Sequence, residues 1–136
     1  MNIKSIITFI LLNCAITGIA QNSSSDAFKT FIQKEKFNSK GNELSLPELK
    51  PIVEKSLHRL ANSFEFIANS SNPEEKFYFV AMTKATNELK PYELDLSVHD
   101  KTLIANYIEE LMDLVQLQSS NGILNRFVYG FEPTKK

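Results

Sequence analysis

The stretch that decides the fold is SVHDKTLIANYIEELMDLVQL, residues 97–117. At about 100° per residue, this stretch places apolar side chains on one arc of a helix and polar side chains on the other. The apolar arc comprises Leu103, Ile104, Tyr107, Ile108, Leu111, Met112, Leu114 and Val115. It covers about half of the helix, more than the roughly 100° stripe of a surface helix, so we expect several neighbouring elements to cover it. Ser97 and Asp100 have capping-box spacing and mark its start, and the turn at residues 119–122 marks its end.

Four further segments with helical patterns accompany this central helix. We expect helices over residues 26–37, 51–68 and 73–89, and a short helix within residues 123–131 that Gly130 ends. The sequence predicts an all-α fold: a single small helical bundle of three main helices, with shorter helices at the N- and C-terminal ends.

The segment boundaries carry more specific predictions. Asn72 and Pro73 predict an N-cap followed by a proline at the first position of the 73–89 helix. The apolar run 77–80 is also compatible with a buried strand, but the signals on both sides favour a helix. Leu94 and Leu96 alternate in a way that directs both toward the core, whereas Phe66 points away from the buried face of its helix.

The first twenty residues have the composition of a cleaved signal peptide. Lys4 supplies a positive start, a continuous apolar run follows, and Gly18 and Ala20 place small residues before the cleavage point. The alternatives are an uncleaved membrane anchor, for which the apolar run is short, and a lipoprotein modified at Cys14. We therefore expect an exported protein, periplasmic or secreted. Its signal peptide is residues 1–20, its flexible leader 21–25, its helical domain 26–131 and its tail 132–136.

Charge and cysteine content limit the classes of partner. The chain has 15 Lys and Arg against 16 Asp and Glu. The signal peptide contributes only Lys4 to these, so the mature net charge is −2. This balance gives no general attraction for nucleic acid or for an anionic membrane surface, so we expect neither as a partner after signal cleavage. Cys14 is the only cysteine and is removed with the signal peptide. The stability of the mature domain therefore depends on its packed core, without disulfides.

One resemblance to a known family rests on the C-terminal part of the chain. The run SSNGILNRFVYGF at residues 119–131 follows an acidic helix containing EELMD at residues 109–113. This pattern resembles the closing motif of a small bacterial family, the domain of unknown function numbered four-eight-four-four. The resemblance covers the second half of the chain, from Phe77 onward. It implies a helical fold and carries over no activity, cofactor or partner.

The two histidines are the weak polar candidates for a site. His58 lies one helical turn after Glu54, and His99 lies four residues after Asp95. Di-iron bundles use paired Glu-x-x-His motifs, which this spacing does not match, so a partly exposed Glu–His pair is the favoured interpretation. The chain also lacks Gly-rich phosphate loops, Cys-x-x-Cys and His-Glu-x-x-His patterns. We therefore expect no catalytic residue, no metal site and no cofactor.

The C-terminal aromatic segment is the favoured candidate for a partner surface. Phe127, Tyr129 and Phe131 exceed what a short terminal helix needs, and Arg126 is a residue type enriched at interface hot spots. Core capping is nevertheless the preferred interpretation of these aromatics, because a small domain must cover its central helix. If part of the segment is exposed, it marks a partner site.

The leading hypothesis is a non-enzymatic exported helical domain that binds an unknown protein partner. A second hypothesis is a small-ligand binder or enzyme with a pocket between helices, using His58 or His99. A third and weaker hypothesis, resting on small size and mild acidity, is a toxin-neutralising, immunity-like protein.

Overall fold

The computed structural model describes residues 25–130, and this part of the chain is built from helices without any strand. Its helices cover residues 25–33, Lys50–Ala68 (α2), Glu75–Glu88 (α3), Val98–Leu114 (α4) and Ile123–Tyr129 (α5), with 3-10 turns at Pro47–Leu49 (η1) and Lys90–Tyr92 (η2). The predicted all-α bundle of three main helices with shorter terminal helices is therefore confirmed, and the 77–80 run is helical. The expected signal peptide and tail lie outside the described residues.

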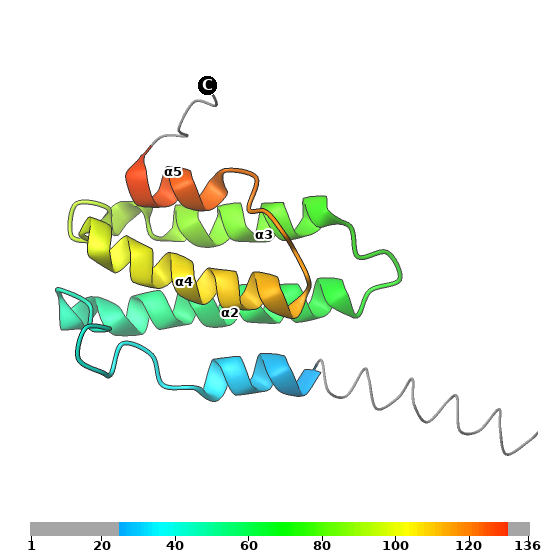
Figure 1. The fold of residues 1–136 in the computed structure, drawn as a ribbon, viewed down its shortest axis with the longest axis horizontal. Coiled ribbons are helices and arrows are strands. Elements are labelled where there is room, and N and C mark those ends of the chain that lie inside the picture. Colours follow the sequence, from blue (N-terminus) through cyan, green and yellow to red (C-terminus); the bar gives the residue numbers. More distant parts are fainter. Residues whose placement is uncertain (1–24, 131–136) are drawn as a thin grey trace, which may run out of the picture.

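The three long helices lie side by side in the middle of the molecule (Figure 1). α2 and α4 run in one direction and α3 runs in the other, with α2 contacting both α3 and α4. α5 lies across the opposite side of the bundle, against α3 and α4, and the helix of residues 25–33 lies along the α2 side. None of the described helices has both the length and the apolar character needed to span a membrane.

α4 supplies the centre of the core, as its sequence pattern predicts. Ile104, Ile108 and Leu111 are at most 1% exposed, and they share the core with fully buried Phe64 of α2 and Met82 of α3. The outer parts of the expected apolar arc are less well covered, since Leu103 and Val115 are only partly buried and Leu114 is exposed. The buried arc is thus narrower than the sequence indicates.

α4 ends three residues earlier than predicted, at Leu114. Gln116 has a φ of 58°, and its N–H donates to the Asp113 carbonyl while the Leu117 N–H donates to the Met112 carbonyl at 2.9 Å. This bond pattern is a Schellman motif with glutamine in the left-handed position where glycine is usual. The buried Leu117 side chain supplies the apolar contact that accompanies such motifs.

The start of α4 is held by a buried carboxylate. The predicted capping box is present: the Asp100 N–H donates to Ser97 Oγ at 3.0 Å, and the Ser97 N–H donates to Asp100 Oδ2 at 2.9 Å. In addition, Ser45 donates to Asp100 Oδ1 from its backbone N–H at 2.9 Å and from its hydroxyl at 3.1 Å. Asp100 therefore caps α4 and also fastens the long loop that precedes α2.

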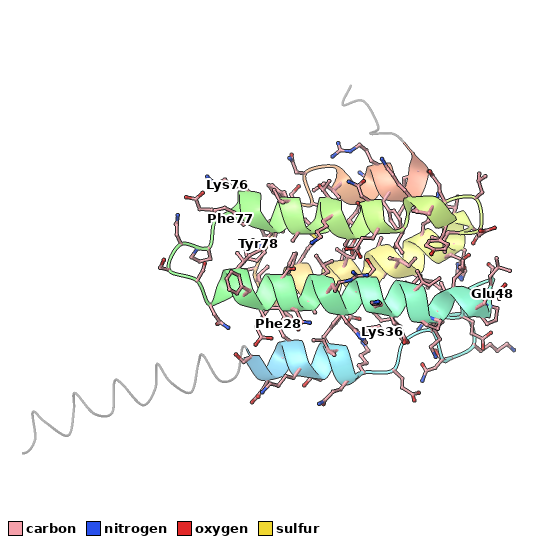
Figure 2. The ribbon with its side chains drawn as sticks, turned by 180° about the vertical axis from the view of Figure 1, so that it is seen from behind. Phe28, Lys36, Glu48, Lys76, Phe77 and Tyr78 are labelled. Carbon is pink, nitrogen blue, oxygen red and sulfur yellow. The ribbon has the colours of Figure 1, made fainter. Side chains whose placement is uncertain are left out.

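A second buried charge, Lys36, fixes the other part of that loop. Its Nζ donates to the carbonyls of Phe31 and Lys34 at the C-terminal end of the first helix, and it lies 4.3 Å from the centre of the Phe31 ring. Beside it, Tyr107 of α4 accepts a hydrogen bond from Asn42 Nδ2 at 2.9 Å and packs edge-on against the Phe37 ring. These contacts seat residues 34–42 on the bundle. Figure 2 shows Lys36 between the first helix and α2.

The first helix ends at residue 33, four residues before its predicted end. Two further local predictions were also wrong. α3 begins at Glu75 with Glu74 as its N-cap, so Asn72 and Pro73 lie outside the helix, and Asn72 Nδ2 donates instead to the Glu74 carboxylate at 3.0 Å. Leu94 is fully exposed whereas Leu96 is buried, because a turn rather than an extended strand connects η2 to α4.

Replacing Asp100 with asparagine should destabilise the domain. Burial raises the pKa of the carboxyl, but the hydrogen bonds from Ser45 and Ser97 outweigh this effect and hold the pKa below the ordinary value of 3.8. Because a hydrogen bond to a charged group contributes about 1.5–3 kcal/mol, Asp100→Asn should lower the free energy of unfolding by about 2 kcal/mol in urea denaturation at neutral pH.

The same change should alter the response to acid. The wild-type contribution is complete above the unfolded value of 3.8 and is lost as the pH falls through the lower folded value, so the variant should lose less stability there. Asp113→Asn, on the exposed side of the same helix, is the control, with an expected change within about 0.5 kcal/mol. Equal effects of the two variants would contradict the role given to Asp100.

Candidate functional site

The structure does not gather the two histidines into a catalytic or metal-binding centre. His58 is half-buried on α2, whereas His99 is exposed in the first turn of α4. Across residues 25–130, no three side chains from His, Cys, Asp and Glu are grouped so that they could hold a metal ion. The histidines therefore contribute no convergent set of ligands within the described part of the chain.

The surroundings of His58 disfavour its charged form. Burial lowers its pKa below the ordinary value of 6.5, and the nearby positive charge of Lys36 lowers it further. Glu54, one turn earlier on α2, acts in the opposite direction and raises the pKa of His58. His58 is thus an imidazole whose protonation is opposed by its position beside the buried Lys36.

The predicted C-terminal partner surface is divided by the α5 helix. Arg126 is exposed and Tyr129 is 57% exposed, whereas Phe127 is half-buried against the core. Phe131 lies outside the described residues. Ile123, Leu124 and Val128 form the buried face of α5. Part of the aromatic excess thus serves the core and part lies on the surface.

Arg126 and Phe127 line a pocket that the sequence does not reveal. It lies among α3, η2, α4 and α5 and has a volume of about 290 Å³. We call it the cationic pocket, because Lys90, Lys101 and Arg126 line it and Glu93 is the only acidic residue that the described part of the chain contributes to its lining. Its residues come from four elements, so no local sequence pattern predicts their proximity.

A larger and more apolar groove lies at the other end of α3. This α2–α3 groove has a volume of about 670 Å³, and its apolar lining residues are Phe66, Ile67, Phe77, Val80 and Ala81. Phe66 is 79% exposed, Val80 68% and Phe77 41%. Figure 2 shows Phe77 beside Lys76 at the start of α3. Large apolar side chains exposed together in this way are typical of interaction sites.

The α2–α3 groove is apolar at one end, and polar and charged side chains line it further along α2 and α3. Amide and hydroxyl side chains line its rim, and Lys84 is its only charged lining residue. Residues Asn62 and Lys84 also line an adjoining hollow that contains Arg59 and Glu88, which are 3.3 Å apart in an ion pair. An apolar end therefore continues into an end with two cations and one anion.

Only part of the α2–α3 groove was detectable from the sequence. Phe66 stands out because it departs from the apolar stripe of its helix. In the helical pattern of residues 75–88, Phe77 shares a face with Tyr78 and Met82, which are buried, yet it is 41% exposed. Val80 lies off that face, but its position beside Phe66 depends on how α2 and α3 pair, which the sequence does not show.

The environment of His58 predicts a loss of stability in weak acid. Because the folded pKa is below 6.5, the unfolded state binds more protons as the pH falls through this value, and stability decreases. We expect His58→Gln to make the decrease in melting temperature between about pH 7 and pH 5 shallower. In an NMR titration, Glu54→Gln should lower the pKa of His58 further, because Glu54 raises it. A pKa of His58 above 6.5 in the wild-type protein would contradict this account.

Comparison with known proteins identifies a family but no activity. No curated protein and no solved structure matches the chain. A family model with the description "Domain of unknown function (DUF4844)" matches residues 19–132, which include every helix described above and agree with the resemblance seen in the C-terminal sequence. The chain therefore belongs to the DUF4844 family.

Proposed function

We propose that this domain is an exported, non-enzymatic protein-binding module that receives an apolar segment of a partner protein in the α2–α3 groove. The observation that carries the proposal is the joint exposure of Phe66 and Val80, at 79% and 68%, on two adjacent helices. Covering a large apolar side chain is worth about 1.5–3 kcal/mol, so a partner that buried both would gain substantial affinity. Export is supported by the signal-peptide pattern of the first twenty residues.

A segment of a different protein fits the α2–α3 groove better than a second copy of this chain. Aromatic side chains bury about 150–250 Å² each, so Phe66, Phe77 and Val80 together offer roughly 300–400 Å² of exposed area. A standard interface needs about 800 Å² from each partner. A short amphipathic segment needs only a few anchors in a groove, and the uncharged polar rim can hydrogen-bond its backbone.

The charges beside the groove define the chemistry of the partner. Lys84 and Arg59 are exposed, whereas the opposing Glu88 carboxylate is 23% exposed and already paired with Arg59. We expect a segment whose apolar anchors lie against Phe66 and Val80 and whose acidic residue, one to two helical turns away, lies near Lys84. Electrostatic complementarity of this kind contributes mainly to specificity and association rate.

Selection of peptides from a random library on the mature protein tests this proposal. The library should yield peptides with two or more large apolar residues and one acidic residue. Phe66→Ser combined with Val80→Ser should weaken their binding at least about a hundredfold, since each lost anchor costs at least about 1.4 kcal/mol, a factor of ten. Fluorescence anisotropy with one selected peptide measures the change.

Leu94→Ser provides the matched control, because Leu94 is fully exposed but lies outside the groove. This variant should bind the selected peptide as tightly as the wild type does. All three positions are exposed, so circular dichroism should show unchanged helix content in every variant. The proposal fails if the library yields no apolar peptides, or if the double variant binds them as well as the control does.

A further inference from the structure

The cationic pocket contains a lysine that lacks a close acceptor. The side chain of Lys101, in the first turns of α4, is only 12% exposed. Within residues 25–130, its ammonium pairs with Glu93 Oε1 at 3.8 Å, beyond hydrogen-bond distance, and Glu93 itself is 58% exposed. An ammonium has three donors and no acceptor, and the Lys101 nitrogen is not buried from solvent, so its donors can be reached from the pocket. The Lys101 ammonium can therefore donate hydrogen bonds to an anion in the pocket.

A second and a third cation line the same pocket. Arg126 reaches it from α5 and Lys90 from η2, so the lining formed by residues 25–130 contains three positive side chains and one carboxylate, that of Glu93. The domain as a whole is mildly acidic, so this concentration of positive charge differs from the rest of the molecule. A local excess of cations in a concave site favours a negatively charged ligand.

The remaining lining limits the ligand to one with an apolar part. Leu89, Leu96 and Ile123 are between 3% and 7% exposed and border the pocket, together with the half-buried Phe127. Since a water molecule occupies about 30 Å³, a pocket of about 290 Å³ holds about ten non-hydrogen atoms. Few precisely placed polar groups on an apolar wall are the common design of small-ligand sites.

We propose that the cationic pocket binds a small organic carboxylate, with its carboxylate at Lys101 and Arg126 and its apolar body against Leu89 and Ile123. The guanidinium can bind a carboxylate through two parallel hydrogen bonds, and the ammonium supplies a point charge beside it. Two sources supply this chemistry: a free organic acid and the C-terminal carboxylate of a peptide. The inference is independent of the α2–α3 groove, with which the pocket shares no residue.

Titration of the mature protein with hexanoate and with hexanamide, followed by ¹⁵N NMR, tests the proposal. Hexanoate should shift the amide signals of Leu96, Lys101 and Ile123 and saturate with a Kd on the order of 1 mM or tighter, as expected for so small a ligand. Hexanamide, which has the same shape without the charge, should bind at least about tenfold more weakly. Inorganic phosphate should also bind more weakly, because it cannot use the apolar wall.

Lys101→Met keeps the side-chain stem and removes the charge, and it should weaken hexanoate binding at least about tenfold. Arg126→Gln should have a similar effect, which covers the case in which Lys101→Met disturbs the fold. The control is Lys55→Met, an exposed lysine of α2 that lines neither the pocket nor the α2–α3 groove, which should leave the Kd unchanged. A merely structural role of Lys101 would not remove the preference for acid over amide.

A pair of peptides distinguishes the two sources of carboxylate. Acetyl-Leu-Leu with a free C-terminus binding more tightly than hexanoate, and than its own C-terminal amide, would identify a peptide end as the ligand. Tighter binding of hexanoate would identify a free acid. The proposal is overturned if no carboxylate shifts these signals, if acid and amide bind equally, or if the Lys101 and Lys55 variants behave alike.

Discussion

The fold depends on burying the apolar side of α4 beneath several neighbouring elements, and no disulfide within residues 25–130 helps to hold these elements in place. The described chain contains no cysteine, so the burial of Ile104, Ile108 and Leu111 must hold the domain together. No single neighbour covers the apolar side of α4: α2 and α5 contact it directly, and Met82 of α3 shares its core. The remaining side is closed by the segment before α2, whose Phe37 ring packs on Tyr107 of α4. The arrangement of these elements around α4 follows from this requirement.

Apolar packing alone does not fix where the covering segment lies, and two buried charges supply that information. Asp100 binds Ser45 through one carboxylate oxygen and caps α4 through the other, while Lys36 bonds to the carbonyls of Phe31 and Lys34. Because leaving either charge without these partners would be costly, other positions of the loop are disfavoured. Both charges are positioned by contacts within the bundle, and their role here is structural.

The features predicted correctly from the sequence were those with local causes. The helical periodicity of α4, its capping box and the left-handed Gly130 each depend on a few neighbouring residues. The errors arose where a local signal was unusual or a distant contact decided the outcome. Gln116 ends α4 in a conformation normally given to glycine, and Asp100 meets Ser45 from 55 positions away. Both surface sites belong to this second class, because each combines residues from separate helices.

The α2–α3 groove and the cationic pocket explain why the apolar residues of α3 do not form one continuous stripe. Only Tyr78, Met82 and Ala85 of its fourteen residues are buried, fewer than a helix in the middle of a bundle would need for packing alone. Val80 and Lys84 line the α2–α3 groove, whereas Thr83 and Thr86 line the cationic pocket on the side of α5. A helix that borders a pocket on two sides does not show a single apolar stripe, because the residues that face each pocket differ in polarity from those that face the core. The irregular pattern of α3 therefore reflects its position between two concave surfaces rather than a poorly formed helix.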